Sequence, residues 1–586
     1  MFWGKLSDLK DNFSPGSLSN DFFIFYSSVY MFDVKKYLIW TFIALVAVLG
    51  SISFFVFGWW PLNLWLFILL IIGLFLSCIF YPREMFWIFI ALLPLENIII
   101  SPAQMPLSLR PYQLVGALLA LSVLILAWRG KLNFKLLSFR VSKTIFQLLG
   151  KLFKRDLLSN EKENIYFKRI DCLIFILPLF AILATINAPD RLLSLRLSLV
   201  LFSFVVLYWL ARNFFRNLQD ILTALWFFAV ASLPVILFGL YQAVADKFNW
   251  LDLQVMDGRI NATFTEPDWL GAYLVFLLAI IFYLRLAVQN FRKNINVASW
   301  SFNWVAQTFL SFYFFFVFLC LFLTMARSAW LGFVAVFLAY YALQIAARKF
   351  PIRNFQFRYR WILTGAGLTI MIAGLAVFLS TLLNLSDFHF FDRTISPVSG
   401  MQKITVSCLR NSNVPLKVEN VNELATYNCR HIDLEEMEDE RSMGFEIKEV
   451  YRPDPNIEIR KNIYDNMWVK IKEHPVLGYG PGTSGMILGR DERGIELNAS
   501  NIFLEIWFSA GLAGLVIFLA FFFYPLARSI KIILSRKAGL LEVFFVMTTI
   551  GILIPNLFNS GLMLGFFWVW LAAVNSLLEE ENRLPG

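Results

Sequence analysis

"RINATFTEPDWLGAYL", residues 259–274, is polar in its first part and apolar in its second. Its right half opens an apolar run that continues to residue 289, long enough to cross a hydrocarbon core of roughly 30 Å. Its left half places Arg259, Glu266 and Asp268 at the mouth of that run. Because charge is costly inside a bilayer, this arrangement predicts a membrane helix with a polar site at one end.

The composition of the whole chain agrees with that interpretation. The 586 residues are 59% hydrophobic and only 16% charged, whereas soluble chains average about 45–50% and 25%. We therefore expect an all-α, polytopic membrane protein. The apolar runs predict about fourteen transmembrane helices, at 37–60, 62–81, 85–100, 112–128, 171–188, 193–212, 220–246, 269–289, 304–325, 329–347, 362–384, 500–525, 541–558 and 562–578.

The basic residues predict the orientation of the chain. A formal net charge of +10 would suggest nucleic acid in a soluble protein, but membrane proteins collect Lys and Arg in their cytoplasmic loops, so we expect no nucleic-acid partner. Segment 129–169 carries eleven basic and three acidic residues. With that segment inside, helix counting places both termini inside and the long 385–499 segment outside.

The predicted organisation follows from these two patterns. It comprises an N-terminal cytoplasmic or interfacial segment (1–36), helices 1–4 (37–128), a basic cytoplasmic loop (129–170), helices 5–11 with the arginine motifs (171–384), one large extracytoplasmic loop between helices 11 and 12 (385–499), helices 12–14 (500–578) and a cytoplasmic tail (579–586).

The large loop contains two cysteines and one helical pattern. On the outer side of the membrane, Cys408 and Cys429 are expected to form a disulfide, with two free thiols as the alternative. Residues 457–473 show apolar side chains at helical spacing. The following "HPVLGYGPG", residues 474–482, breaks the chain with prolines and glycines.

Three arginines lie at the predicted outer face. Arg259 precedes a span, Arg327 interrupts two apolar runs, and Arg196 lies about one turn inside its span. Guanidinium groups bind phosphate in a bidentate manner, so the three would suit a lipid-linked phosphate. The alternative is that each only reaches to the headgroups.

Two carboxylates lie at the starts of predicted spans, Glu266 before 269–289 and Glu505 within 500–525. Glu266 either favours the dipole of the following helix or acts on a hydroxyl nucleophile. Ser500 and Asn501 suit a helix N-cap, and Glu505 lies one turn further in. The sequence contains no HExxH, CxxC or Walker-type loop, so we expect no metal and no cofactor.

Three stretches together resemble one family. "RINATFTEPDWLGAYL" (259–274) is similar to an Arg-x-x-Gly/Ala-x-Phe-x-x-Pro-Asn-x-x-Ala motif, and "LTMARSAWLGFVAVFL" (323–338) to a Thr-x-Ser-Arg-Gly-Ala-Trp-Leu-Gly motif. "HPVLGYGPGTSG" (474–485) followed by "NASNIFLEIWFSAGLAGLVIFLA" (498–520) is similar to a His-Pro-Leu-Leu-Gly-x-Gly turn and a His-Asn-x-x-Leu span start. In this order, over roughly residues 170–560, they resemble the O-antigen ligase and polymerase superfamily of bacterial membrane glycosyltransferases.

The resemblance implies a GT-C-like helical fold and a metal-independent reaction. A glycan carried on undecaprenyl diphosphate would be transferred to the hydroxyl of a glycan, lipid or protein acceptor. The site would face outward from the bacterial cytoplasmic (inner) membrane, in surface polysaccharide biosynthesis. Arg259, Arg327 and Arg196 would stabilise the diphosphate as it leaves.

One position departs from the ligase pattern. Ser500 stands where the ligases carry a histidine that is thought to activate the acceptor, and serine is not a base near neutral pH. Glu266 and Glu505 are the preferred substitutes, with His474 third. Ligase and polymerase activities both remain open, and the alternatives are a lipid-linked glycan transporter or a non-catalytic envelope-assembly protein.

Overall fold

The computed structural model describes most of the chain. The described residues are 34–105, 108–128, 132–136, 163–167, 169–251, 253–256, 258–291, 298–349, 359–385, 401–410, 412–432, 437–453, 455–489, 497–535 and 539–580. The predicted N-terminal segment, basic loop and C-terminal tail lie largely outside them. The predicted domain boundaries stay predictions.

Within the described residues, one apolar helix lies in each predicted run. These helices are α3 (Val34–Val56), α4 (Leu64–Phe80), α5 (Pro82–Leu92), α6 (Pro111–Trp128), α8 (Arg169–Ala184), α9 (Arg191–Phe214), α10 (Leu218–Lys247), α11 (Pro267–Phe291), α12 (Ala298–Leu323), α13 (Arg327–Ala346), α14 (Tyr359–Leu382), α19 (Ile502–Leu534), α20 (Leu540–Asn556) and α21 (Gly565–Glu580).

Fewer of the described helices meet the length expected of a membrane span than the fourteen that were predicted. Eight of the described helices are long enough and apolar enough to cross a membrane, so the count of fourteen is not confirmed. α5 shows why, because it has only 11 residues and extends about 16 Å. Pro94 follows its end, and proline cannot donate the backbone hydrogen bond that would continue a helix. The chain from there to Ile100 is instead folded into the protein, with Ile98 fully buried.

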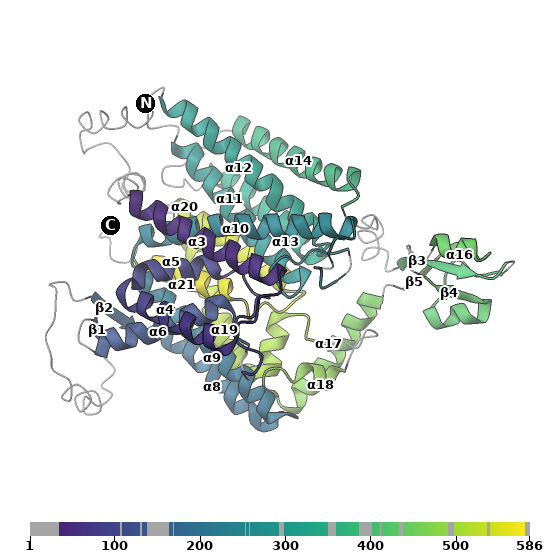
Figure 1. The fold of residues 1–586 in the computed structure, drawn as a ribbon, viewed down its shortest axis with the longest axis horizontal. Coiled ribbons are helices and arrows are strands. Elements are labelled where there is room, and N and C mark those ends of the chain that lie inside the picture. The colour runs from purple at the N-terminus through teal and green to yellow at the C-terminus, as the bar shows by residue number, and fades with distance from the viewer. Residues whose placement is uncertain are drawn as a thin grey trace.

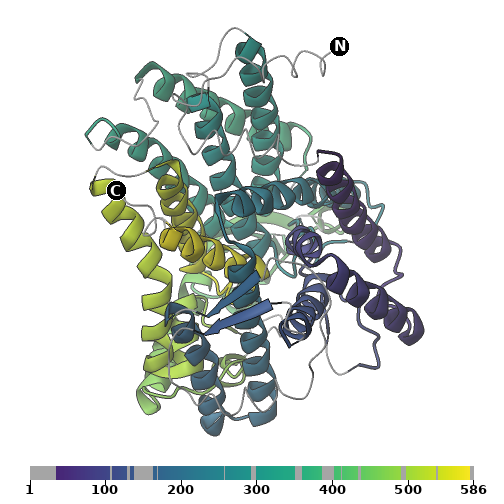
Figure 2. The same cartoon turned by 90° about the vertical axis from the view of Figure 1, so that its left-hand side faces the viewer.

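The helices pack around a buried centre. α11 is the most buried of the eight candidate spans and α14 the least. α11 lies against α12, α13 and α20, and α21 lies against α9. In Figure 2 the purple helices α3 and α4 lie on the right, the blue α8 and α9 at the bottom, and the teal α11–α14 toward the top, while the yellow α20 and α21 lie left of the centre. The ends of these central helices therefore bring together loops that are far apart in the sequence.

A small sheet stands apart from the helices (Figure 1). It is three-stranded, in the order β4-β3-β5, and antiparallel. Its elements are β3 (Met401–Cys408), the 3-10 helix η3 (Val421–Tyr427), β4 (Cys429–His431), the short helix α16 (Met437–Ser442) and β5 (Glu446–Pro453). Val406, Leu424 and Val450 form its core. The expectation of a purely helical protein is therefore too narrow, because this part of the loop buries apolar side chains between strands.

Cys408 and Cys429 form a disulfide across β3 and β4. After β5, α17 (Pro455–Glu473) covers the predicted helical pattern, and α18 (Ser484–Leu488) follows the Pro- and Gly-rich turn. The 3-10 helix η2 (Thr185–Asn187) extends α8. The parallel pair β1 (Leu132–Leu136) and β2 (Glu163–Phe167) lies at the end of the molecule opposite the three-stranded sheet (Figure 1).

Candidate active site

The first motif forms a buried loop between α10 and α11. Its residues 260–264 are each no more than 2% exposed. The Gln242 side chain on α10 accepts a hydrogen bond from the backbone N–H of Ala262 at 2.7 Å. The Thr263 hydroxyl donates to the carbonyl oxygen of Pro94 at 2.6 Å. The loop is therefore fixed on both sides, and it holds the charged residues at its ends in defined positions.

Arg259 connects the first motif to the second. Its Nε donates to the carbonyl oxygen of Thr324 at 3.0 Å, and its Nη2 lies 3.3 Å from Oδ1 of Asp268. The side chain is 17% exposed. Gly271 allows this approach of the two motifs, because a Cβ there would overlap the Ala329 side chain.

Arg327 is the first residue of α13, where the second motif turns into its helix. The neighbouring Ser328 accepts a hydrogen bond of 3.5 Å from the Asn559 side chain. Asn559 lies in the connection between α20 and α21. Arg259 and Arg327 thus occupy the same end of the helical bundle, beside that connection.

The third motif is a turn that is seated on a break in α19. Gly511 has φ 69° and ψ −175° inside this helix, a backbone conformation that favours glycine. The carbonyl oxygen of Pro475 accepts the backbone N–H of Leu512 at 2.9 Å, and the N–H of Tyr479 donates to the carbonyl oxygen of Phe508 at 2.7 Å. The turn therefore satisfies backbone groups that the break leaves without helical partners.

The same turn reaches α9 on its other side. Gly480 and Gly482, both with positive φ, lie so close to Ser194 and Leu197 that a Cβ on either glycine would overlap them. The Asn187 side chain donates to the carbonyl oxygen of Gly478 at 3.0 Å. The turn thus fills the space between α9 and α19.

A cavity of about 200 Å³ lies where these elements meet. Its walls come from α8, α9, the start of α11, the turn, α19 and the α20–α21 connection. Most lining side chains are apolar, and the polar ones come mainly from α19, the residues before it and the α20–α21 connection. The lining residues are Leu177, Leu197, Leu201, Trp269, Pro481, Gly482, Asn498, Glu505, Ile506, Ser509, Ala510, Ser560, Leu562 and Met563.

Glu505 is the carboxylate in this cavity. Its Oε1 accepts a hydrogen bond from the Ser509 hydroxyl at 3.3 Å, and its Oε2 accepts the backbone N–H of Ala499 at 3.4 Å. No ion pair joins it to a residue that the structure describes. A carboxylate held by two neutral donors in an apolar setting keeps acceptor capacity for a further proton donor.

Glu266 lies just before α11, next to Trp269 of the cavity wall. Burial raises the pKa of its carboxyl above the ordinary value, and the like charge of Asp268 adds to the rise. The Arg259 guanidinium opposes both effects. Its backbone carbonyl oxygen accepts the N–H groups of Trp269 and Leu270 at 3.2 Å each, so Glu266 also begins the helix.

The remaining predicted residues lie around the cavity, not in its wall. Asn501 is the N-cap of α19, accepting from Phe503 and Leu504, and it donates to the carbonyl oxygen of Leu557 at 3.1 Å. Ser500 precedes it with φ 47° and donates to Asn498 at 3.2 Å.

His474 and Arg196 are exposed. The His474 ring packs edge-on against Tyr479 at 4.9 Å between centroids, in the turn. Arg196 does not line the cavity, although its neighbour Leu197 does. Their predicted functional roles stay predictions.

Several residues of the wall were not singled out in the sequence. Asn498 and Trp269 lie inside the quoted motifs. They could have been found as a polar and an aromatic residue at the start of a predicted span. Ser509 could have been found from its position one turn after Glu505. Ser560 carries no local signal, because it reaches the cavity only through the packing of the α20–α21 connection. In the described part of the chain, no group of three His, Cys, Asp or Glu residues is placed to hold a metal ion.

Comparison with known proteins adds to this geometry. Residues 312–519 match the family model described as O-antigen ligase. The match begins in α12, contains Arg327 and the 474–482 turn, and ends in α19 beyond Glu505. No curated protein and no solved structure matches the chain. Residues 312–519 are therefore similar to the O-antigen ligase family, and this similarity supports placing the multi-pass membrane protein in the O-antigen ligase and polymerase superfamily.

Proposed function

We propose that this protein transfers a glycan from an undecaprenyl-diphosphate donor to an acceptor hydroxyl on the outer face of the bacterial cytoplasmic membrane. The observation that carries the proposal is the position of Glu505. This carboxylate lines a largely apolar cavity, and Trp269 lies in the same wall. The residue before Trp269 is Asp268, which forms an ion pair with Arg259. A proton acceptor and a phosphate-binding group therefore adjoin one cavity.

The proposed chemistry is a displacement at the anomeric carbon. The acceptor oxygen forms a bond to this carbon, and the bond from the carbon to the diphosphate oxygen breaks. The electron pair leaves with the diphosphate, and the hydroxyl proton passes to Glu505. The hydrogen bonds from Ser509 and Ala499 hold the carboxylate toward the acceptor in this scheme. Glu266 is the second candidate for the base.

The donor would be held by both polar and apolar contacts. Arg259 and Arg327 are proposed to stabilise the negative charge that develops on the diphosphate. The Nη1 of Arg259 has a long contact of 3.5 Å to the Met256 sulfur, which is a weak partner that a phosphate oxygen would replace. Leu177, Leu201 and Leu562 offer an apolar wall to the polyprenyl chain. Arg196 is retained as a third proposed phosphate contact, from the outer surface of α9.

The direction in which the site faces is supported by the three-stranded sheet. The turn of the site follows this sheet directly through α17, so the two lie toward the same end of the helices (Figure 1). The sheet carries the disulfide between Cys408 and Cys429, and disulfides persist mainly in oxidising, extracytoplasmic compartments. This supports a site that faces outward.

The test is a transfer reaction with the full-length protein in lipid nanodiscs. The donor is an undecaprenyl-diphosphate-linked oligosaccharide, offered with candidate glycan, lipid and protein acceptors in the presence of EDTA. We expect free undecaprenyl diphosphate and a transferred glycan with the wild type, and a strong loss with Arg327→Gln. Arg528→Gln, on the opposite end of α19, is the matched control and should keep full activity. The length of the product distinguishes ligation from polymerisation.

The opposite result would be equally clear. If the wild type binds the donor lipid but releases no diphosphate with any acceptor, the transferase proposal fails and a transporter or assembly protein takes its place. If transfer requires a divalent cation that EDTA removes, the metal-independent part of the proposal fails alone.

A further inference from the structure

A second polar cavity lies within α11–α14, away from the candidate active site. It has a volume of about 40 Å³ and is lined by side chains of all four helices. Arg285 stands 16 residues after Trp269 on α11, which corresponds to about 24 Å along a helix. The cavity therefore lies toward the opposite end of these helices and is separate from the proposed transfer site.

Arg285 is the charged group of this cavity. Its side chain is only 6% exposed. It donates to the Ser311 hydroxyl at 3.1 Å and the Thr369 hydroxyl at 3.3 Å, and its guanidinium lies 5.0 Å from the centre of the Phe314 ring. Its Nε is buried without a hydrogen-bond partner. Among the described residues no carboxylate forms an ion pair with it.

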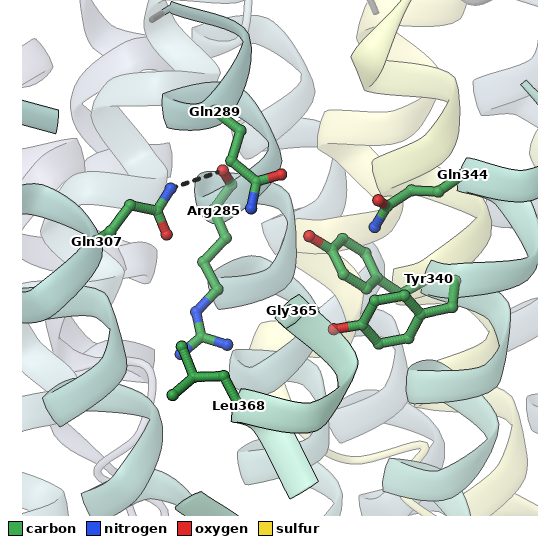
Figure 3. A pocket seen from close by; sticks show the side chains of 8 residues that line it. Arg285, Gln289, Gln307, Tyr340, Gln344, Gly365 and Leu368 are labelled. Carbon is green, nitrogen blue, oxygen red and sulfur yellow. Dashed lines mark hydrogen bonds between the residues drawn. The ribbon is translucent and has the colours of Figure 1, made fainter. Parts of the chain in front are cut away.

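The polar groups around Arg285 are neutral amides and hydroxyls, all of which can donate a hydrogen bond. Figure 3 shows Arg285 and Tyr340 approaching the cavity from different helices, with Gln289 and Gln344 near one end. The Gln344 side chain is 5% exposed, and its Nε2 is also buried without a hydrogen-bond partner. Burying an amide or a charge without a partner is unfavourable, so these two nitrogen atoms are available to an acceptor.

We infer that this cavity binds a phosphate group, which Arg285 and Gln344 contact through their unpartnered nitrogen atoms. The positive charge without a described carboxylate partner selects an anion. Donors arrive from Arg285 on α11 and from Gln344 and Tyr340 on α13. The tetrahedral oxygens of a phosphate suit donors from several directions better than the two coplanar oxygens of a carboxylate. The volume corresponds to about three water positions, which fits a group of this size but not a sugar.

Part of the cavity lining reaches the surface of the helices. Leu368 of α14 lines it and is 42% exposed. Arg285 lies six residues before the end of α11, or about 9 Å along the helix. This depth is within reach of a lipid headgroup and of a free phosphate entering from the adjacent solution.

The experiment measures the melting temperature of the full-length, delipidated protein in neutral detergent. The three probes are phosphatidylglycerol, inorganic phosphate and diacylglycerol, the last as a lipid without phosphate. We expect phosphatidylglycerol or inorganic phosphate to raise the melting temperature, since a ligand of the folded state stabilises it. A response to phosphatidylglycerol alone identifies a lipid headgroup, and a response to inorganic phosphate identifies a free anion. Because this readout needs no glycan donor, its failure leaves the proposed transferase function standing.

The variants separate binding from folding. Arg285→Gln should raise the concentration of phosphate probe that gives half of the melting-temperature shift by about tenfold or more, because charge-assisted hydrogen bonds are lost. Gln344→Met should leave the ligand-free melting temperature unchanged or higher, since a buried unpartnered amide is removed, and should still weaken the response. Arg528→Gln is the control and should respond as the wild type does. The proposal is overturned if no phosphate probe raises the melting temperature, if diacylglycerol acts equally, or if Arg285→Gln responds fully.

Discussion

Arg259 donates a hydrogen bond from Nε to the carbonyl oxygen of Thr324 at 3.0 Å. This contact joins a loop before α11 to the end of α12, three residues before Arg327. Two arginine motifs that are separated by a whole hairpin of helices therefore share one location. Because the hydrogen bond uses Nε, the other guanidinium nitrogen atoms reach Asp268 and the Met256 sulfur.

Replacement of Arg259 should reduce transfer strongly. Arg259→Gln removes the positive charge and should lower kcat/KM by about 10²–10³, the usual loss for one group that stabilises a developing oxyanion. Arg259→Lys keeps the charge but loses the bidentate geometry, and it should recover only part of the rate. Both are measured from the release of undecaprenyl diphosphate. Arg191→Gln, an exposed residue at the start of α9, is the control. Equal rates for Arg259→Gln and this control would exclude the role.

Glu266 should make stability depend on pH. Burial and Asp268 raise its pKa in the folded state, so folding favours the protonated carboxyl. Below the unfolded-state pKa the group is neutral in both states and costs nothing. As pH rises through the folded-state pKa, the folded protein loses stability relative to the unfolded chain. Glu266→Gln should therefore match the wild type at low pH and melt at a higher temperature at neutral pH. Parallel melting curves over the whole range would contradict this.

The break in α19 should be sensitive to a single methyl group. Gly511→Ala places a Cβ at φ 69° and against the backbone of Val476, so it should destabilise the protein by about 2–3 kcal/mol or more. Gly374→Ala is the matched control, because a Cβ at that position of α14 meets nothing within 4 Å. It should stabilise the protein by about 0.4–1 kcal/mol. Both are measured from unfolding in denaturant, and a harmless Gly511→Ala would mean that the turn does not need the break.

The disulfide should stabilise only the three-stranded sheet and not the membrane helices. Replacing Cys408 and Cys429 together with serine opens a link across 21 residues, which corresponds to about 3 kcal/mol in the chain-entropy view. We expect faster amide hydrogen exchange in β3, β4 and η3, with α11 unchanged. Cys172→Ser, an exposed free cysteine on α8, serves as the control. Faster exchange in α11 would show that the sheet supports the membrane helices, which this account does not expect.

Much of the helical fold could be predicted, because apolar length is a local signal. The helix at 269–289 was found almost to its ends, since Pro267 begins α11 and charges mark its mouth. The helix expected at 85–100 ends at Leu92, because Pro94 redirects the chain into the protein. The strands β3–β5 escaped prediction because their apolar residues are few and their pairing is long-range.

Two charged residues of the candidate site could be predicted from the sequence, but the shape of the cavity could not. Glu505 and Arg259 follow from the cost of charge near hydrocarbon. The break at Gly511 does not, because "SAGLAGL" is locally an unbroken apolar helix, and it opens only where the 474–482 turn docks on it. Ser560 reaches the cavity by the same kind of long-range packing.

The most direct test of the central claim compares Glu505→Gln with the wild type in the transfer reaction over a range of donor concentrations. The account predicts that kcat falls by about 10²–10⁴, the usual contribution of a general base. It also predicts that KM for the undecaprenyl-diphosphate donor stays within about threefold, since the arginines and apolar wall remain. Glu505→Asp should recover part of kcat. A Glu505→Gln enzyme with the wild-type kcat would contradict the assignment of Glu505 and move the search for the base to Glu266.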